Sequence, residues 1–304
     1  MNFAVIVPTL NASAGWPVFA GALLGCVGAD RVLIVDSAST DGTADLARRA
    51  NFQVAEISRS EFNHGGTRQW AAALVPDAEI LIYLTQDAIL ADRDAIANLL
   101  LTFDDPEVGA TCGRQLPRHE ADPIEVHARL FNYPAESNVR SLEARERLGI
   151  KSIFISNSFA AYRRRAFEAV GGFPTDVIFG EDTVLAGKLL LNGWKVAYAG
   201  NACVYHSHSY TVVEEFRRYF DIGVLHTRES WLLQEFGRAN GEGKRFVLSE
   251  LKYLLRTDAS LIPLALTRTA AKLAAYRLGK MERVLYNPVK RRLSMHRHFW
   301  DQAS

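Results

Sequence analysis

Two pairs of side chains suited to catalysis, Gln86-Asp87 and Glu181-Asp182, lie at the ends of apolar or turn-like sequence. The first pair closes the apolar run 80–85, and the second precedes a helix-like run. A carboxylate that follows a buried strand lies where open α/β sheets bind their ligands. A second carboxylate brought near it can hold a metal ion or act as a base. This combination suits an enzyme that handles a diphosphate.

Each carboxylate also has a purely structural interpretation. A carboxylate after a strand often caps the next helix, but Asp92 lies nearer to that helix than Asp87 does. This favours a metal-binding role for Asp87, because Mg²⁺ is commonly bound through one or two carboxylates together with phosphate oxygens. Glu181 and Asp182 equally fit the first turn of a helix, where the helix dipole favours negative charge. The residues alone leave both interpretations of Asp182 open.

Three further polar segments lie at predicted strand ends or helix starts. In 35–43, Asp36 can accept a hydrogen bond from a base or a ribose, while the same segment would cap the following helix. The segment 8–11 ends the first strand, and it either contacts the same ligand or only forms a turn. In 63–68, two glycines and Arg68 offer an anion site at a helix start, or simply begin that helix.

His206 and His208 are two residues apart, so on an extended segment both face the same side. That geometry suits a metal ion or a diphosphate, although two surface histidines would have the same spacing. The phosphate-binding patterns G-x-G-x-x-G and G-x-x-x-x-G-K-[ST] are absent. Their absence argues against a dinucleotide-binding enzyme or a P-loop protein.

Short apolar strands alternate with helices over the first 115 residues, which predicts a parallel, doubly wound α/β sheet. We expect strands at 3–7, 31–35, 53–57, 80–84 and 108–112, and helices at 15–24, 43–50, 66–74 and 92–103. More polar sequence follows, with helical patches at 124–131 and 142–148. From about residue 212 the pattern is helical and increasingly basic.

The composition is that of a folded globular protein, with 48% hydrophobic and 23% charged residues among 304. Three widely spaced cysteines indicate no disulfide framework, so we expect a reducing cytoplasm. We expect no signal peptide, because no basic stretch precedes the first apolar run. A membrane-spanning helix is also not expected, since the late apolar stretch 259–275 contains Arg268 and Lys272.

Charge is distributed unevenly along the chain. Residues 244–298 contain 13 Lys and Arg against 3 Asp and Glu, a balance of +10, whereas residues 1–243 contain 22 against 30, a balance of −8. This basic helical segment, with interleaved Leu and Tyr and with Trp300 just beyond it, could rest on anionic lipid head groups. A solvated tail or a contact within a homo-oligomer is the alternative. Nothing in the body of the chain favours nucleic-acid binding.

Five segments taken together resemble the family-2 glycosyltransferases of the GT-A fold, and among them the bacterial dTDP-rhamnosyltransferases. The resemblance covers roughly residues 2–230. In chain order, the segments are Val7–Asn11, Val35–Thr43, Phe62–Arg68, Thr85–Ala88 and Gly180–Asp182. The sequences Asn-His-Gly-Gly-Thr-Arg and Thr-Gln-Asp-Ala within them are the ones that point to rhamnose transfer.

The resemblance implies roles for individual residues. Asp182 would be the general base, and Asp87 would hold a divalent metal ion, Mg²⁺ or Mn²⁺, with help from His206 or His208. The family's usual metal motif is Asp-x-Asp, but Ala88 stands where a second aspartate is common. The acceptor would be contacted by Glu181 and Asn157, and the nucleotide sugar by Pro8, Thr9, Asn11, Asp36, Ser37, Ser39, Arg68, Gln86 and Asp87.

The resemblance further implies an architecture and a reaction. Residues 1–230 would form the GT-A domain, with a nucleotide-sugar half at 1–115 and an acceptor half at 116–230, and residues 231–304 would form a basic helical extension. The enzyme would move L-rhamnose from dTDP-β-L-rhamnose, with inversion, to a hydroxyl of a saccharide acceptor. A polyprenyl-linked acceptor in O-antigen or capsule synthesis would place the protein peripherally on the cytoplasmic face of the inner membrane.

Three alternatives remain at this point. A glycosyltransferase of the same fold could use another nucleotide sugar. A sugar nucleotidyltransferase also has aspartates at strand ends, but its glycine-rich, basic N-terminal signature is missing here. A non-catalytic membrane-associated scaffold would not need both Asp87 and Asp182, so the presence of both argues against it.

Overall fold

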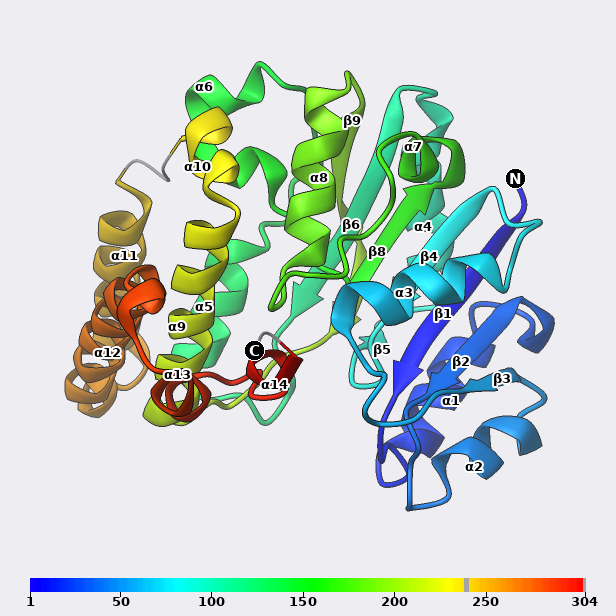
Figure 1. Cartoon of the computed structure of the whole chain (residues 1–304), viewed down its shortest axis with the longest axis horizontal. Helices are drawn as coiled ribbons and strands as arrows, with labels where there is room; N and C mark the ends of the chain where they lie inside the picture. Colours follow the sequence, from blue (N-terminus) through cyan, green and yellow to red (C-terminus); the bar gives the residue numbers. More distant parts are fainter. Residues whose placement is uncertain (238–240, 303–304) are drawn as a thin grey trace.

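The computed structural model describes residues 1–237 and 241–302, which form one nine-stranded mixed sheet with helices on both faces and a helical lobe at one side (Figure 1). The strand order is β3-β2-β1-β4-β8-β6-β9-β5, with β7 paired to β9. The predicted α/β class with a mostly parallel sheet and a C-terminal helical part is confirmed.

The N-terminal part of the sheet is parallel, as predicted. It contains β1 (Phe3–Thr9), β2 (Val32–Asp36), β3 (Gln53–Glu56) and β4 (Ile80–Leu84). Every residue of β2 and β4 is buried, as expected of strands covered on both faces. Alternate side chains enter two separate cores, one beneath α1 (Trp16–Leu24), α2 (Thr43–Arg49) and α4 (Ala95–Leu100), the other beneath α3 (His64–Ala73), α7 (Arg164–Ala169) and α8 (Glu181–Leu191).

The second part of the sheet departs from a purely parallel arrangement. The strand β8 (Phe159–Arg163) is inserted antiparallel between β4 and β6 (Val108–Leu116). The long strand β9 (Lys195–Tyr205), which the sequence pattern did not predict, runs parallel to β6. Because β8 is antiparallel to both β4 and β6, the strands β6 and β9 run in the same direction as β4. The strands β4 and β9 therefore end at the same edge of the sheet. The short strands β5 (Ile89–Leu90) and β7 (Asn138–Arg140) pair antiparallel with β9.

Local capping explains several helix starts. Asn63 accepts a hydrogen bond from the Gly66 amide, so α3 begins at His64, two residues before the predicted start. Asp122 caps α5 (Pro123–Asn132) in the same way. The helix expected at 92–103 is shorter: α4 covers only its middle, and a 3₁₀ turn, η2 (Leu101–Asp104), follows. The remaining helix of this part is α6 (Ala144–Leu148).

The C-terminal helices are packed against the sheet domain. They are α9 (Val212–Arg228), α10 (Ser230–Phe236), α11 (Glu242–Thr257), α12 (Ile262–Lys280), α13 (Asn287–Leu293) and α14 (Phe299–Gln302). Residues 238–240 and 303–304 of the predicted extension lie outside the described residues. The backbones of α9 and α12 meet at Gly223 and Gly279, where any Cβ on Gly279 would lie 2.0 Å from the Phe220 carbonyl oxygen. No described helix is long and apolar enough to cross a membrane.

Candidate active site

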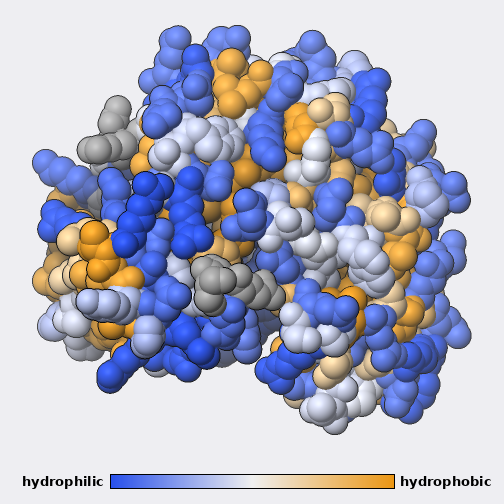
Figure 2. All heavy atoms as spheres, in the orientation of Figure 1, coloured by the Kyte–Doolittle hydropathy of each residue, from blue (hydrophilic) through white to orange (hydrophobic). Residues whose placement is uncertain are grey.

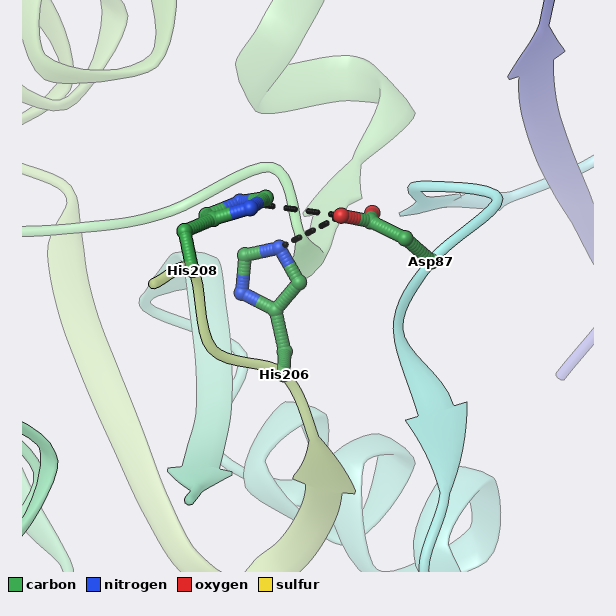
Figure 3. A group of neighbouring side chains, drawn as sticks. All are labelled: Asp87, His206 and His208. Carbon is green, nitrogen blue, oxygen red and sulfur yellow. Dashed lines mark ion pairs between the residues drawn. The ribbon is translucent and has the colours of Figure 1, made fainter. Parts of the chain in front are cut away.

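Asp87, His206 and His208 converge at the edge where β4 and β9 end (Figure 3). Asp87 lies in the turn between β4 and β5, and both histidines follow β9 directly. The Asp87 Oδ2 atom is 3.3 Å from His206 Nε2 and 3.6 Å from His208 Nε2. The predicted grouping of one carboxylate with two histidines is therefore present in space, and it has the ligand types that divalent transition metals accept.

Gln115, at the end of β6, orients His206. Its Oε1 lies 3.0 Å from His206 Nδ1 and also accepts a hydrogen bond from Arg129 at 2.6 Å. Because Gln115 Oε1 can only accept, the tautomer assigned from this contact carries its proton on Nδ1. His206 Nε2 then faces the Asp87 carboxylate, and it holds either a proton, which it donates to Asp87, or a metal ion. Two electron-pair donors facing each other are the arrangement that a cation or a proton between them would stabilise, so the residues fit a metal ion.

The charge states of the group also suit metal binding. Burial raises the pKa of Asp87, but the hydrogen bond and charge of His206 outweigh it and hold that pKa well below its ordinary value. Burial, together with the neighbouring His206, lowers the pKa of His208 to about 4. At neutral pH, Asp87 is ionised and His208 is neutral. These are the protonation states in which the two side chains ligate metals.

The predicted nucleotide residues form a hydrogen-bonded rim at the ends of β1 and β2. Asp36 is 1% exposed and accepts hydrogen bonds from the Thr9 hydroxyl at 3.1 Å, the Ser39 hydroxyl at 2.6 Å and the Ser39 amide at 2.8 Å. Ser39 Oγ accepts in turn from the Asn11 amide. Asp36 therefore holds the two strand ends together, while Asn11 is exposed on the rim.

Gln86 ties β4 to the same rim. Its side chain accepts a hydrogen bond from the Leu10 amide at 2.7 Å and donates one to the Leu10 carbonyl at 3.0 Å. Pro8 is half-buried within β1, and Ser37 is buried directly after β2. The structure thus brings all the predicted nucleotide residues except Arg68 to the ends of β1, β2 and β4. Their contacts with a nucleotide sugar remain predictions.

Arg68 belongs to a different group. Its guanidinium lies 3.1 Å from Glu181 Oε1, and both side chains are buried. Glu181 also accepts a hydrogen bond from the Asn157 side chain at 2.9 Å, and Asn157 accepts one from the Tyr162 hydroxyl. The predicted acceptor residues Glu181 and Asn157 are each 4% exposed. This buried network holds the first turn of α8 against α3 and β8.

Asp182 lies beside that network but is only partly buried. Its two carboxylate oxygens accept hydrogen bonds from the Asn157 amide at 3.0 Å and the Thr183 amide at 2.7 Å. Burial and then the negative charge of Glu181 raise the pKa of Asp182 to about 6, against the two amide bonds. A fixed carboxylate with that pKa is suited to accept a proton at neutral pH.

The segment that follows α13 also reaches the network around Arg68, Glu181 and Asp182. His296 lies 3.3 Å from His64, which begins α3, and stacks on Phe179 just before α8. The backbone amide of His296 donates to the buried carboxylate of Asp221 on α9. The predicted extension is therefore part of the structure around Asp182.

Sequence reasoning missed Gln115, Arg129 and Arg118. Arg118 donates a hydrogen bond to the Asp87 carbonyl at 2.6 Å. Gln115 carries the same signal that marked Gln86, a polar residue at the end of an apolar strand. The strand was predicted to end at 112, whereas β6 extends to Leu116, so Gln115 was not placed at a strand end.

The fold is that of a glycosyltransferase, and residues 4–171 match the family model described as glycosyl transferase family 2. The chain belongs to that family. It is 48% identical to the O-antigen chain rhamnosyltransferase RfbN of Salmonella typhimurium over 99% of this chain and 96% of the relative. It is 45% identical to the O-antigen chain rhamnosyltransferase WbaN of Salmonella anatum over the same shares.

Solved structures share the fold. The mannosyltransferase PcManGT from Pyrobaculum calidifontis, in complex with GDP-Man and Mn²⁺, superposes with a TM-score of 0.59 at 23% identity. The superposition covers 99% of this chain and 86% of the PcManGT chain. TarS from S. aureus gives a TM-score of 0.53 at 17% identity and covers 93% and 91%. The predicted GT-A fold is thereby confirmed.

Proposed function

We propose that this glycosyltransferase moves L-rhamnose from dTDP-β-L-rhamnose to a hydroxyl of a saccharide acceptor in O-antigen synthesis. The observation that carries the proposal is the near full-length identity to two proteins named O-antigen chain rhamnosyltransferases. The rim at the ends of β1 and β2 supports it, because Asn11 and Ser39, held in place by the buried Asp36, offer amide and hydroxyl groups to a nucleoside at the ends of parallel strands.

A divalent metal ion, Mg²⁺ or Mn²⁺, would be held by Asp87, His206 and His208. When bound, it would neutralise the charge that develops on the departing nucleoside diphosphate. Gln115 would keep the His206 lone pair directed at the ion, and Arg118 would hold the Asp87 turn in place.

Asp182 would remove the proton from the acceptor hydroxyl as that oxygen attacks the anomeric carbon. The amides of Asn157 and Thr183 fix its carboxylate, and the charge of Glu181 raises its proton affinity. Glu181 is buried and forms an ion pair with Arg68, so it would act on the substrate through Asp182. With one carboxylate base and a single displacement, the anomeric centre would be inverted.

The reaction can be tested with labelled dTDP-rhamnose and a polyprenyl-linked saccharide acceptor. Wild type should form labelled product and Asp182→Asn should not, while both bind dTDP. Transfer from UDP- or GDP-sugars with no transfer from dTDP-rhamnose would instead establish another donor. Equal dTDP affinity in wild type and Asp87→Ala, each with and without Mn²⁺, would exclude the metal role of Asp87.

An exposed surface with apolar and basic side chains supports a membrane-linked acceptor, and we propose that it faces the lipid. Met281, Val284 and Tyr286, between α12 and α13, are 56, 73 and 82% exposed, and Val289 on α13 is 41% exposed. Figure 2 shows hydrophobic atoms gathered over the end of α12 beside strongly hydrophilic ones. The exposed cations among them are Lys280, Arg283, Arg291 and Arg292. Apolar side chains interleaved with cations are suited to an anionic membrane surface.

Vesicle sedimentation tests this surface. Wild type should bind vesicles that contain anionic lipid, and binding should weaken with salt. The double variant Val284→Asp, Tyr286→Asp should lose binding. Val18→Asp, at a residue that is 65% exposed on α1, is the matched control and should bind like wild type. If both variants bound vesicles like wild type, this surface would be excluded as the membrane contact.

A further inference from the structure

A cavity of about 600 Å³ lies between α5, α9, α11 and α12, beside the candidate metal group. Its volume is within the range of roughly 300–1,000 Å³ that small-molecule sites occupy. The cavity exists only because the C-terminal helices α11 and α12 pack across α5 and α9. None of the residues assigned above to the donor lies in its wall except His208.

The cavity and the metal group share one side chain. His208, one of the three grouped side chains, lines it together with Tyr210. Arg129, which also lines the cavity, donates to Gln115 Oε1, which orients His206. A molecule held in the cavity would therefore lie next to the place where the donor diphosphate is proposed to bind.

Glu125 lines the cavity and has one buried carboxylate oxygen without a partner in the described part of the chain. The residue is 6% exposed, and its Oε2 accepts a hydrogen bond from Ser209 at 2.8 Å. Its Oε1 has no hydrogen-bond partner among the described residues, and Glu125 lines the cavity. A buried carboxylate oxygen without a partner is costly, so this atom is suited to accept a hydrogen bond from a ligand hydroxyl.

The rest of the wall fits a sugar better than a lipid chain or a diphosphate. Phe131, Tyr219 and Phe246 offer aromatic surface, against which the C–H face of a pyranose can pack. An acyl chain has no donor for the unpartnered oxygen of Glu125. The charges of the wall balance, which does not favour an anion: the carboxylates are Glu125, Glu215, Glu242 and Glu250, and the cations are Arg129, Arg218, Arg268 and Lys272.

We propose that this cavity binds the saccharide part of the acceptor, with Glu125 accepting a hydrogen bond from a sugar hydroxyl. The inference rests on the proposed transferase function and names the site at which its acceptor is selected. The helical extension would then contribute directly to acceptor specificity.

Two variants test the site without touching the proposed base or metal ligands. Leu273→Trp places a large ring at the cavity rim, at a residue that is 50% exposed. Leu266→Trp, at 48% exposure two helical turns away on α12 and outside the cavity wall, is its matched control. Glu125→Gln keeps the side-chain shape and removes the charge.

The probes are methyl glycosides of galactose, glucose and mannose, observed by saturation-transfer NMR on the full chain, with dTDP binding measured in parallel. At least one glycoside should bind wild type and Leu266→Trp equally. Its affinity should fall about tenfold or more in Leu273→Trp and Glu125→Gln, as loss of a charged hydrogen bond predicts. All four proteins should bind dTDP alike.

No glycoside binding to wild type, or equal binding to all four proteins, would overturn the acceptor site. A failure of wild type to bind dTDP, with glycoside binding intact, would instead contradict the proposed donor and leave the saccharide site standing. Loss of both ligands in Leu273→Trp alone would indicate misfolding of that variant, and Glu125→Gln would then decide.

Discussion

Replacing Asp182 by asparagine should abolish transfer while leaving the protein at least as stable at pH 8. The pKa of Asp182 is raised from 3.8 to about 6 in the fold. Since each pH unit between the two values corresponds to ~1.36 kcal/mol, the ionised carboxylate costs about 3 kcal/mol of stability above pH 6. Asparagine removes that cost. Its NH₂ group, however, must face the backbone N–H of either Asn157 or Thr183, and two donors facing each other cost about 1–3 kcal/mol. The net effect is a gain of about 0–2 kcal/mol.

The gain should depend on pH in a defined direction. A carboxyl group with a raised pKa destabilises the fold above that pKa, and the cost is lost as pH falls toward the unfolded value. At pH 5 the cost of the Asp182 charge falls to about 1.5 kcal/mol, so the advantage of Asp182→Asn should shrink by about the same amount.

Urea unfolding of both proteins at pH 8 and pH 5, with transfer rates measured at pH 8, provides the assay. Loss of a general base should lower the transfer rate by roughly 10²–10⁴-fold. Retention of more than about a tenth of the wild-type rate would refute the base assignment. A variant that is much less stable at pH 8 than at pH 5, relative to wild type, would refute the account of the buried charge.

Three further predictions follow from the same contacts. The value of kcat/KM should fall about tenfold per pH unit below about pH 6, as Asp182 gains a proton, and a pH profile will show whether it does. Gln115→Ala should weaken Mn²⁺ binding about 10–100-fold in titration calorimetry with dTDP present, because His206 loses its orienting partner. Gly279→Ala should destabilise the protein by about 1–3 kcal/mol, since the new Cβ would strike the α9 backbone. Gly243→Ala, where the added Cβ meets open space on α11, is the control and should raise the free energy of unfolding by about 0.5–1 kcal/mol. Chemical unfolding of both variants measures the difference.

Local sequence patterns predicted the N-terminal half of the fold well. The strand at 80–84 has the predicted bounds, because an unbroken apolar run is typical of a strand buried on both faces. The strand β9 was missed, since its residues 195–205 mix apolar side chains with Gly200 and Asn201 and lack clean alternation. The antiparallel β8 was also not foreseen, because an apolar run does not encode the direction in which it will pair.

The chain by itself determined that carboxylates stand at strand and helix ends, at Asp87 and Asp182, because those positions are set by local periodicity and turns. Only the tertiary structure decided which groups meet. His206 and His208 reach Asp87 because β8 is inserted antiparallel and β9 then runs with β4. The pairing of distant strands is governed by long-range burial, which short patterns do not contain. For the same reason the cavity lined by Glu125 appears only when the C-terminal helices pack across α5 and α9.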